Sequence, residues 1–407
     1  MATSSFFPGS TVRNALVSWE KRLFEELAKG SDLLCVDVLG VQFGVRWGRA
    51  VTRQQREGMS AAWSRCASVR QRMLPPLPEE PTADLPFTAS VAHRSVTHDG
   101  GTFHLQAASF EELAETLTTR LTLAAILANA GELTMLHACG VADPLTGAVV
   151  ALVAKSGSGK TTAASVLAKS YGYVTDETVA IAHDGSVVPY PKPLSVKHGR
   201  SPYKRQVGPD ELGLLPVIAM PFIQSIVLLD RVQGGVPMAP VLKKVPLADA
   251  VLALLPETSS QAKIGAPLQS LCHLIDDVGG VWQVTYSEAE DLPAVLEPLF
   301  REQPRPEPEW EAKVTESAGT EDIPQDAFRR APAQDAVAVG GDLLVMLENH
   351  VVRLSGIGPA IWEAAAAPVP LEDLMEAVAR VHGTPEGYPA AVERAAQQLA
   401  AESVLEK

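Results

Sequence analysis

Cysteine is scarce in this chain of 407 residues: Cys35, Cys66, Cys139 and Cys272 lie far apart in the sequence. Without the closely spaced pairs typical of zinc sites, a cysteine-bound metal is excluded, and we expect reduced thiols of a cytoplasmic protein. Long apolar runs are also lacking, which excludes a membrane-spanning helix. The first residues show no basic segment followed by an apolar core, so an export signal is not predicted.

Basic residues are outnumbered by acidic ones. The 34 lysines and arginines stand against 48 aspartates and glutamates and give a formal net charge of −14. Such a charge disfavours nucleic acid and anionic membranes as main partners. The hydrophobic content of 46% is ordinary for a globular protein, and the length suffices for two or three domains with separate cores.

The most informative segment spans residues 149–162 and reads VVALVAKSGSGKTT. A β-branched apolar strand feeds a loop of glycine and serine, and a helix-forming segment follows. Backbone N–H groups of such a loop converge on phosphate oxygens, and the helix presents the positive end of its dipole to the same anion. We therefore predict a nucleotide phosphate site formed by Lys155, Ser156, Gly157, Ser158, Gly159, Lys160, Thr161 and Thr162.

We make a separate prediction for each of three residues in this loop. Lys160 is expected to reach the β- and γ-phosphates, and the Thr161 hydroxyl to bind Mg²⁺. Ala154 stands where the pattern G-x-x-x-x-G-K-[ST] has its first glycine. A methyl group is compatible with this position if φ is negative, because glycine is required only where φ is positive or the backbone approach is very close.

Two adjacent acids, Asp176 and Glu177, follow a predicted strand just after the loop helix. In a doubly wound sheet the carboxyl ends of the strands line the ligand crevice. One carboxylate is expected to bind Mg²⁺ and the other to accept a hydroxyl proton. Asp230 competes for this role because it follows four aliphatic residues, as in a Walker B strand, although it could simply pair with Arg231. We favour Asp176 because its adjacent acids and their spacing fit the family resemblance given below.

His137 and a basic segment at residues 190–205 complete the candidate site. His137 follows apolar residues shortly before the loop strand and is either a core histidine or a site residue. Lys197 and Arg200 of the basic segment are expected to stabilise the transferred phosphoryl charge or to bind an acidic peptide. The alternative is a solvated basic loop.

Periodicity predicts a succession of strands and helices up to residue 300. Ser109 and Glu112 are predicted to form a capping box. The helix that follows places five apolar residues on one face, namely Leu113, Leu117, Leu121, Ala124 and Ala128. The other predicted elements are a helix at 16–27, a hairpin of strands 33–39 and 41–47, a proline-rich connector at 74–86, strands at 133–137, 179–183 and 223–229, and helices at 247–255 and 268–274. The apolar strand at 223–229 is expected in the centre of its sheet.

Residues 301–326 are rich in proline and glutamate and predict a stiff, solvated linker. A compact C-terminal unit is expected beyond it. Its predicted elements are strands at 336–339, 343–347 and 350–354, and helices at 359–366, 371–381 and 389–402.

Three ordered segments together resemble the HPr kinase/phosphorylase family: LHACGV at 136–141, SGSGKT at 156–161 and VTDE at 174–177. The resemblance covers residues 105–295 and implies an α/β P-loop core that transfers phosphate from ATP to a hydroxyl, usually of serine. It implies that Asp176 is the general base and that His137 lies near the transferred phosphate. Glu177 stands in place of a second aspartate, and Ala154 in place of a glycine.

Residues 343–355 and 357–363 resemble the PqqD-like fold, the peptide-recognition element of ribosomal natural-product pathways. This resemblance implies that a leader peptide binds as an added strand at a sheet edge, with a helix completing the groove. The alternative is a generic winged-helix module. A DNA-reading version is disfavoured because the segment 371–380 is net acidic.

These observations predict an α/β protein with an N-terminal accessory region at 1–104, an HPr-kinase-like P-loop kinase domain at 105–300, a linker at 301–326 and a PqqD-like domain at 327–407. We expect a kinase that uses ATP and Mg²⁺ to phosphorylate a Ser or Thr hydroxyl of a precursor peptide, whose leader is bound by residues 327–407. One alternative, which Ala154 and Glu177 favour, is a nucleotide-dependent peptide chaperone or adaptor. Another is a small-molecule kinase with a regulatory winged helix.

Overall fold

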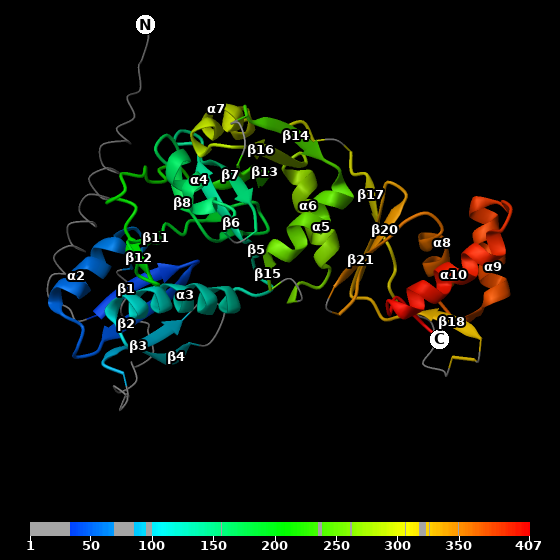
Figure 1. Ribbon diagram of the computed structural model, residues 1–407, viewed down its shortest axis with the longest axis horizontal. Helices are drawn as coiled ribbons and strands as arrows, with labels where there is room; N and C mark the ends of the chain where they lie inside the picture. Colours follow the sequence, from blue (N-terminus) through cyan, green and yellow to red (C-terminus); the bar gives the residue numbers. More distant parts are fainter. Residues whose placement is uncertain are drawn as a thin grey trace, which may run out of the picture. The chain divides into compact units, whose positions relative to one another are not determined.

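The computed structural model shows a mixed α/β protein with several sheets (Figure 1). The residues it describes are 33–68, 85–94, 100–155, 157–234, 238–260, 263–305, 307–316, 323–324, 326–348 and 350–407. The helix predicted at 16–27 and most of the connector predicted at 74–86 lie outside these ranges. Within them, no helix is both long enough and apolar enough to cross a membrane.

The chain groups into two compact units, each made of several stretches of sequence. The first unit comprises residues 1–129, 138–147 and 159–221, and the second comprises 130–137, 148–158 and 222–407. The loop at residues 154–161, called the phosphate loop below after its predicted role, passes from the second unit to the first between Ser158 and Gly159. The domain boundaries expected from the sequence stay predictions.

The first unit begins with an antiparallel sheet in the order β1-β2-β3-β4. Its strands are β1 (Leu33–Val38), β2 (Val41–Trp47), β3 (Phe87–Arg94) and β4 (Gly101–Ala107). The predicted β1–β2 hairpin is confirmed. Its two turn residues, Leu39 and Gly40, both have positive φ, at 53° and 80°, which is the turn geometry that matches the twist of a hairpin. The Gly40 N–H also donates to Asp37 Oδ1 at 2.8 Å.

Helix α3 (Phe110–Ala128) packs against this sheet, as Figure 1 shows, and α2 (Arg53–Ala62) belongs to the same unit. Leu113, Leu117 and Leu121 are completely buried, as their helical spacing predicts. The predicted capping box is only half present. Ser109 Oγ accepts from the Glu112 N–H at 3.2 Å, but the Glu112 carboxylate accepts from the N–H of Ala108, one residue before the expected partner.

The rest of the first unit carries the helix of the phosphate loop. This helix, α4 (Lys160–Leu167), packs on β6 (Ala138–Ala142), which pairs antiparallel with β8 (Gly172–Thr175). Two short hairpins follow: β9 (Val179–Ile181) with β10 (Val187–Val188), and β11 (Leu194–Lys197) with β12 (Lys204–Val207).

The second unit contains the strand that enters the phosphate loop. That strand, β7 (Ala148–Val153), is completely enclosed and pairs parallel with β13 (Phe222–Arg231). On its other side β13 pairs parallel with β16 (Val281–Tyr286), which confirms its predicted central place. β14 (Val241–Val245) adds antiparallel to β16. The unit also holds β5 (Thr134–Leu136) paired with β15 (Thr258–Ser259), and the helices α5 (Leu247–Leu254), α6 (Pro267–Asp277) and α7 (Leu292–Leu296).

The C-terminal part of the second unit is a sheet with helices on one face. The sheet has the order β17-β19-β20-β21, formed by β17 (Trp310–Ala312), β19 (Asp335–Val339), β20 (Asp342–Met346) and β21 (Val351–Leu354). The helices are α8 (Gly358–Ala364), α9 (Leu371–His382) and α10 (Tyr388–Ala401), and a small sheet joins β22 (Val369–Pro370), β18 (Ala327–Arg330) and β23 (Leu405–Glu406). Leu343, Val345 and Leu354 pack with Trp362 in one core, which confirms the predicted strands and helices.

Part of the segment predicted as a solvated linker is instead structured. Residues Trp310–Ala312 form β17 and pair antiparallel with β19. Trp310 Nε1 also donates to Asp276 Oδ2 of α6 at 2.7 Å. The prediction failed here because the strand depends on a partner far away in sequence, whereas its local composition favours an extended, solvated chain.

Asp335 joins the C-terminal sheet to α6. The N-cap residue of α6 is Ala266, which provides no side-chain acceptor. Asp335 Oδ2 accepts instead from the N–H groups of Leu268 at 2.7 Å and Gln269 at 3.0 Å. Because Asp335 is only 2% exposed, this cap is a buried tertiary contact within the second unit.

Candidate active site

The phosphate loop has the backbone geometry of an anion site. Gly157 and Gly159 have φ of 81° and 101°, a region that strongly favours glycine. Ser158 Oγ donates to Lys155 O at 2.6 Å and closes a tight turn. Helix α4 begins at Lys160 without a side-chain cap, so its first N–H groups have no intrahelical acceptor. These groups and the helix dipole favour an anion at the start of α4. Ser156 lies outside the described residues.

Ala154, which stands at the position of the first glycine of the pattern, does not have a positive φ. Among the described residues other than glycine, positive φ occurs at Leu39, Ser260, Asp326 and Ser403, and Ala154 is not one of them. Its backbone therefore does not require glycine.

The Asp176 carboxylate lies directly against the loop helix. Asp176 follows β8, is 5% exposed, and its Oδ2 accepts from the Thr161 hydroxyl at 3.1 Å. Its other oxygen, Oδ1, accepts from the Tyr173 hydroxyl at 3.1 Å. Strand β8 and helix α4 thus bring together two of the predicted metal ligands, Thr161 and Asp176.

Lys192 belongs to the basic segment at 190–205, where the sequence analysis singled out Lys197 and Arg200 instead, and it completes this cluster. Lys192 Nζ lies 2.8 Å from Asp176 Oδ1 and 3.2 Å from Glu177 Oε2, and its side chain is 3% exposed. The signal in the sequence was its place between two prolines, which restrict the backbone there. Glu177, the third predicted metal ligand, is thus connected to Asp176 through Lys192.

The protonation states within the cluster follow from its burial and charges. Burial by itself lowers the pKa of Lys192, but the Asp176 and Glu177 carboxylates outweigh it, so the pKa lies above its usual value and the ammonium stays charged. Burial, reinforced by Asp176, raises the pKa of Tyr173 well above its usual value, so its hydroxyl remains a donor. Burial also raises the pKa of Cys139 to about 12, with Asp176 adding to the shift and Lys160 opposing it.

Asp230, the competing acid, is bonded differently. Its Oδ2 accepts from Thr285 Oγ1 at 2.9 Å and from Gln283 Nε2 at 3.1 Å, both on the neighbouring strand β16. The predicted alternative pairing with Arg231 does not form, because Arg231 Nε donates to Ser287 O at 3.1 Å.

The other residues predicted for the site make none of the contacts of the Asp176 carboxylate described above. His137 is half-buried after β5, and its backbone N–H donates to Glu257 O at 2.6 Å. Lys160 is 7% exposed at the start of α4, and Thr162 is exposed in the same turn. Lys197 and Arg200 are exposed at the β11–β12 hairpin, and neither contributes to the hydrogen bonds and ion pair of the Asp176 carboxylate described above.

A pocket of about 550 Å³ in the second unit borders the first half of the phosphate loop. Lys155 and Ser158 of the loop line it, and Leu252, Ala253 and Pro256 give it an apolar wall. The volume lies in the range of small-molecule and cofactor sites.

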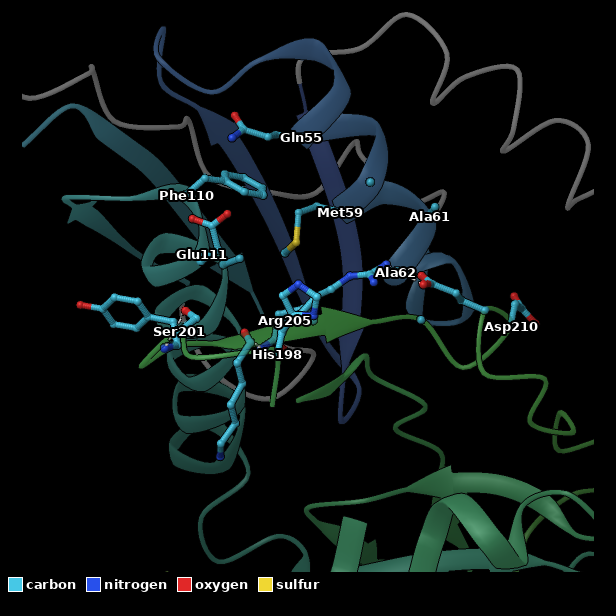
Figure 2. A pocket seen from close by; sticks show the side chains of 17 residues that line it. Gln55, Met59, Ala61, Ala62, Phe110, Glu111, His198, Ser201, Arg205 and Asp210 are labelled. Carbon is cyan, nitrogen blue, oxygen red and sulfur yellow. Dashed lines mark hydrogen bonds and ion pairs between the residues drawn. The ribbon is translucent and has the colours of Figure 1, made fainter. Parts of the chain in front are cut away.

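A second pocket, of about 540 Å³, lies in the first unit between α2, the start of α3 and the β11–β12 hairpin. Figure 2 shows Phe110 and Glu111 of α3, Met59 of α2, and His198 and Arg205 of the hairpin region around it. Its lining includes apolar residues such as Met59 and Phe110 and charged residues of both signs such as Glu111 and Arg205. It contains none of the residues predicted from the sequence to bind nucleotide or metal.

Comparisons with known proteins complete the description of the site. No family model matches the chain, and no curated protein matches it. Among solved structures, the Hpr(Ser) kinase/phosphatase from Coxiella burnetii matches with 11% sequence identity, a TM-score of 0.22, and coverage of 40% of this chain and 92% of that chain. The comparisons do not identify a PqqD-like domain, and this resemblance stays a prediction.

Proposed function

We propose that this chain is a kinase that transfers the γ-phosphoryl group of ATP, with Mg²⁺, to a Ser or Thr hydroxyl of a peptide. The observation that carries the proposal is the 3.1 Å contact between the Thr161 hydroxyl and Asp176 Oδ2. It places the metal-binding hydroxyl expected of a phosphate loop beside a buried carboxylate. Phosphoryl transfer needs little more from a protein than such positioning and charge stabilisation.

The residues around this contact fit Mg²⁺. The ion prefers hard oxygen ligands and is usually held by one or two carboxylates together with substrate phosphates. Thr161 Oγ1 and, of the two adjacent carboxylates, that of Glu177 supply such oxygens, which leaves Asp176 Oδ2 for the acceptor hydroxyl. In the described part of the chain no cluster of three or more His, Cys, Asp or Glu side chains offers an alternative cage. When bound, Mg²⁺ supplies charge neutralisation on the phosphates.

The transfer step assigns a role to each residue. The loop N–H groups and Lys160 bind the β- and γ-phosphates. The acceptor oxygen forms a bond to the γ-phosphorus as the bond to the bridging oxygen breaks, and ADP leaves with that electron pair. Asp176 orients the acceptor hydroxyl and receives its proton.

The edge of the C-terminal sheet supports recruitment of the peptide. The Leu347 N–H donates to His350 O at 2.9 Å, in register with the β20–β21 pairing. In an antiparallel pair this bonding alternates, so the backbone N–H and C=O groups of Val351 and Arg353 are directed away from β20. In the described chain β21 is the last strand of its sheet, so an extended leader peptide can add there.

Mass spectrometry tests the catalytic proposal. The chain is co-expressed with a library of short Ser- and Thr-containing peptides, and a peptide that it recognises is expected to gain one phosphate. Asp176→Asn should abolish the modification, while Asp184→Asn, an exposed turn residue, should preserve it. If phosphate is released from ATP and the peptide stays unmodified, the chain is a nucleotide-dependent adaptor instead. If Asp230→Asn abolishes transfer and Asp176→Asn does not, the acid has been assigned to the wrong strand.

Binding of the leader is tested separately at β21. Val351→Pro removes an outward N–H and keeps the bonds to β20, so leader affinity should fall about tenfold, as expected for the loss of roughly 1.4 kcal/mol. Fluorescence anisotropy of a labelled leader measures the affinity, and thermal unfolding verifies the fold. Unchanged affinity in a folded variant refutes binding at this edge.

A further inference from the structure

The Lys192 side chain is only 3% exposed, so its ion pair with Asp176 is buried and not a surface pair. Its ammonium group has three N–H donors, and three acceptors surround it: Asp176 Oδ1 at 2.8 Å, Glu177 Oε2 at 3.2 Å and Pro193 O at 3.2 Å. Every donor therefore has a partner. A buried charge is stable only when it is paired and bonded in this way.

The two oxygens of the Asp176 carboxylate have different hydrogen-bond partners. Oδ1 accepts from Lys192 and from the Tyr173 hydroxyl, so it is held on the side away from the loop. Oδ2 accepts from the Thr161 hydroxyl and is the oxygen presented to the loop helix. A carboxylate held through one oxygen presents the other in a defined direction.

The backbone around Lys192 holds this arrangement in place. Prolines on both sides restrict φ, and the Lys192 N–H donates to Tyr190 O at 2.8 Å. Tyr190 is completely buried, and its hydroxyl lies 2.7 Å from Thr122 Oγ1 of α3. The lysine is thus fixed by a buried segment rather than by a surface loop.

Lys192 also balances the charge of the two adjacent acids. Its ammonium group lies 2.8 Å from Asp176 Oδ1 and 3.2 Å from Glu177 Oε2, so one cation is shared by both carboxylates.

We propose that Lys192 is a positioning residue, which holds Asp176 through Oδ1 and thereby directs Oδ2 toward the start of helix α4. This inference rests on the proposed kinase function. It predicts that kcat depends on the bond from Lys192 to Oδ1, while binding of the nucleotide does not.

Two substitutions test this prediction. Lys192→Met removes the bond to Oδ1 and the charge, so kcat should fall about 100-fold, as for a misplaced reacting group, while KM for ATP stays within about twofold. Lys192→Arg keeps the charge and changes the geometry, so kcat should fall and KM for ATP should again stay near the wild-type value. The exposed Lys243→Met on β14 is the matched control and should change neither.

Tyr173→Phe is a milder third variant, since it removes the other bond to Oδ1 and leaves the charges intact. It should lower kcat about tenfold and leave KM for ATP unchanged. It decides the question if Lys192→Met does not fold.

The experiment uses the full chain, a Ser- or Thr-containing peptide that the wild type phosphorylates, and a non-hydrolysable ATP analogue whose Mg²⁺-dependent binding is measured by calorimetry. Equal analogue affinity in the wild type and Lys192→Met shows that the nucleotide site is intact, so a lower kcat then supports positioning. If the wild type transfers no phosphate to any peptide, the proposed function fails and the inference fails with it. If the wild type is active and Lys192→Met retains its kcat, the Lys192 inference is overturned while the kinase proposal stands.

Discussion

Replacing Asp335 by alanine should loosen the start of α6 and its junction with the C-terminal sheet. The Asp335 carboxylate is 2% exposed and accepts from the N–H groups of Leu268 and Gln269, and Gln269 Nε2 also donates to it at 2.7 Å. Alanine leaves these donors without a partner in a site that contacts β19.

The size of the effect follows from the contacts removed. Two hydrogen bonds from backbone donors to a charged group contribute about 1.5–3 kcal/mol each, which sets an upper value of about 6 kcal/mol. Loss of an exposed N-cap costs about 1 kcal/mol, which sets a lower value. For a buried cap we expect Asp335→Ala to lower the free energy of local opening of α6 by about 3 kcal/mol. The equilibrium constant for this opening then rises about 100-fold.

Amide hydrogen exchange measured by mass spectrometry tests this value on peptides that cover α6. Protection of the α6 amides should fall about 100-fold in Asp335→Ala and by a smaller factor in Asp335→Asn, which keeps an acceptor oxygen. Glu311→Gln, in an exposed ion pair with Lys313, should change protection less than about threefold. A change in Asp335→Ala no larger than in this control would refute the role of the carboxylate as a cap.

Three further predictions concern the loop, the thiols and the core. Gly159→Ala should weaken nucleotide binding in calorimetry, because φ of 101° strains an alanine by about 1–2 kcal/mol, whereas Gly199→Ala, at φ of 55° in an exposed hairpin, should bind normally. Cys139 should resist iodoacetamide at pH 7 and react only after unfolding, because a pKa of about 12 leaves about one thiolate in 10⁵; rapid labelling of the native chain would contradict its burial. Leu117→Ala should lower stability to urea by about 3 kcal/mol, and a loss below 1 kcal/mol would mean that α3 is not packed as described.

Features that depend on neighbours in sequence were predictable. The strand β7, the loop and helix α4 follow one another within residues 148–167, so their apolar run, glycines and helix formers are all read from one segment. The β1–β2 hairpin and the buried face of α3 were predictable for the same reason, because a two-residue turn and a helical repeat are local. Even the half-formed capping box at Ser109 departs from expectation by one residue only.

The contacts that give the candidate site its chemistry depend on the tertiary structure. Thr161, Asp176 and Lys192 come from a helix start, a strand end and a proline-flanked segment, and no spacing rule relates them. The choice between Asp176 and Asp230 follows from which hydroxyl each carboxylate meets, Thr161 or Thr285.

The sequence by itself therefore determined that a buried strand feeds a glycine-rich loop and a helix, and that acidic and basic residues follow them, because these patterns lie in consecutive residues. The fold alone decided that Asp176 meets Thr161, that Lys192 is buried between two carboxylates, and that Trp310–Ala312 becomes a strand. The physical reason is that burial, ion pairing and strand pairing are properties of residues brought together from distant positions, and their free energy appears only when the chain is packed.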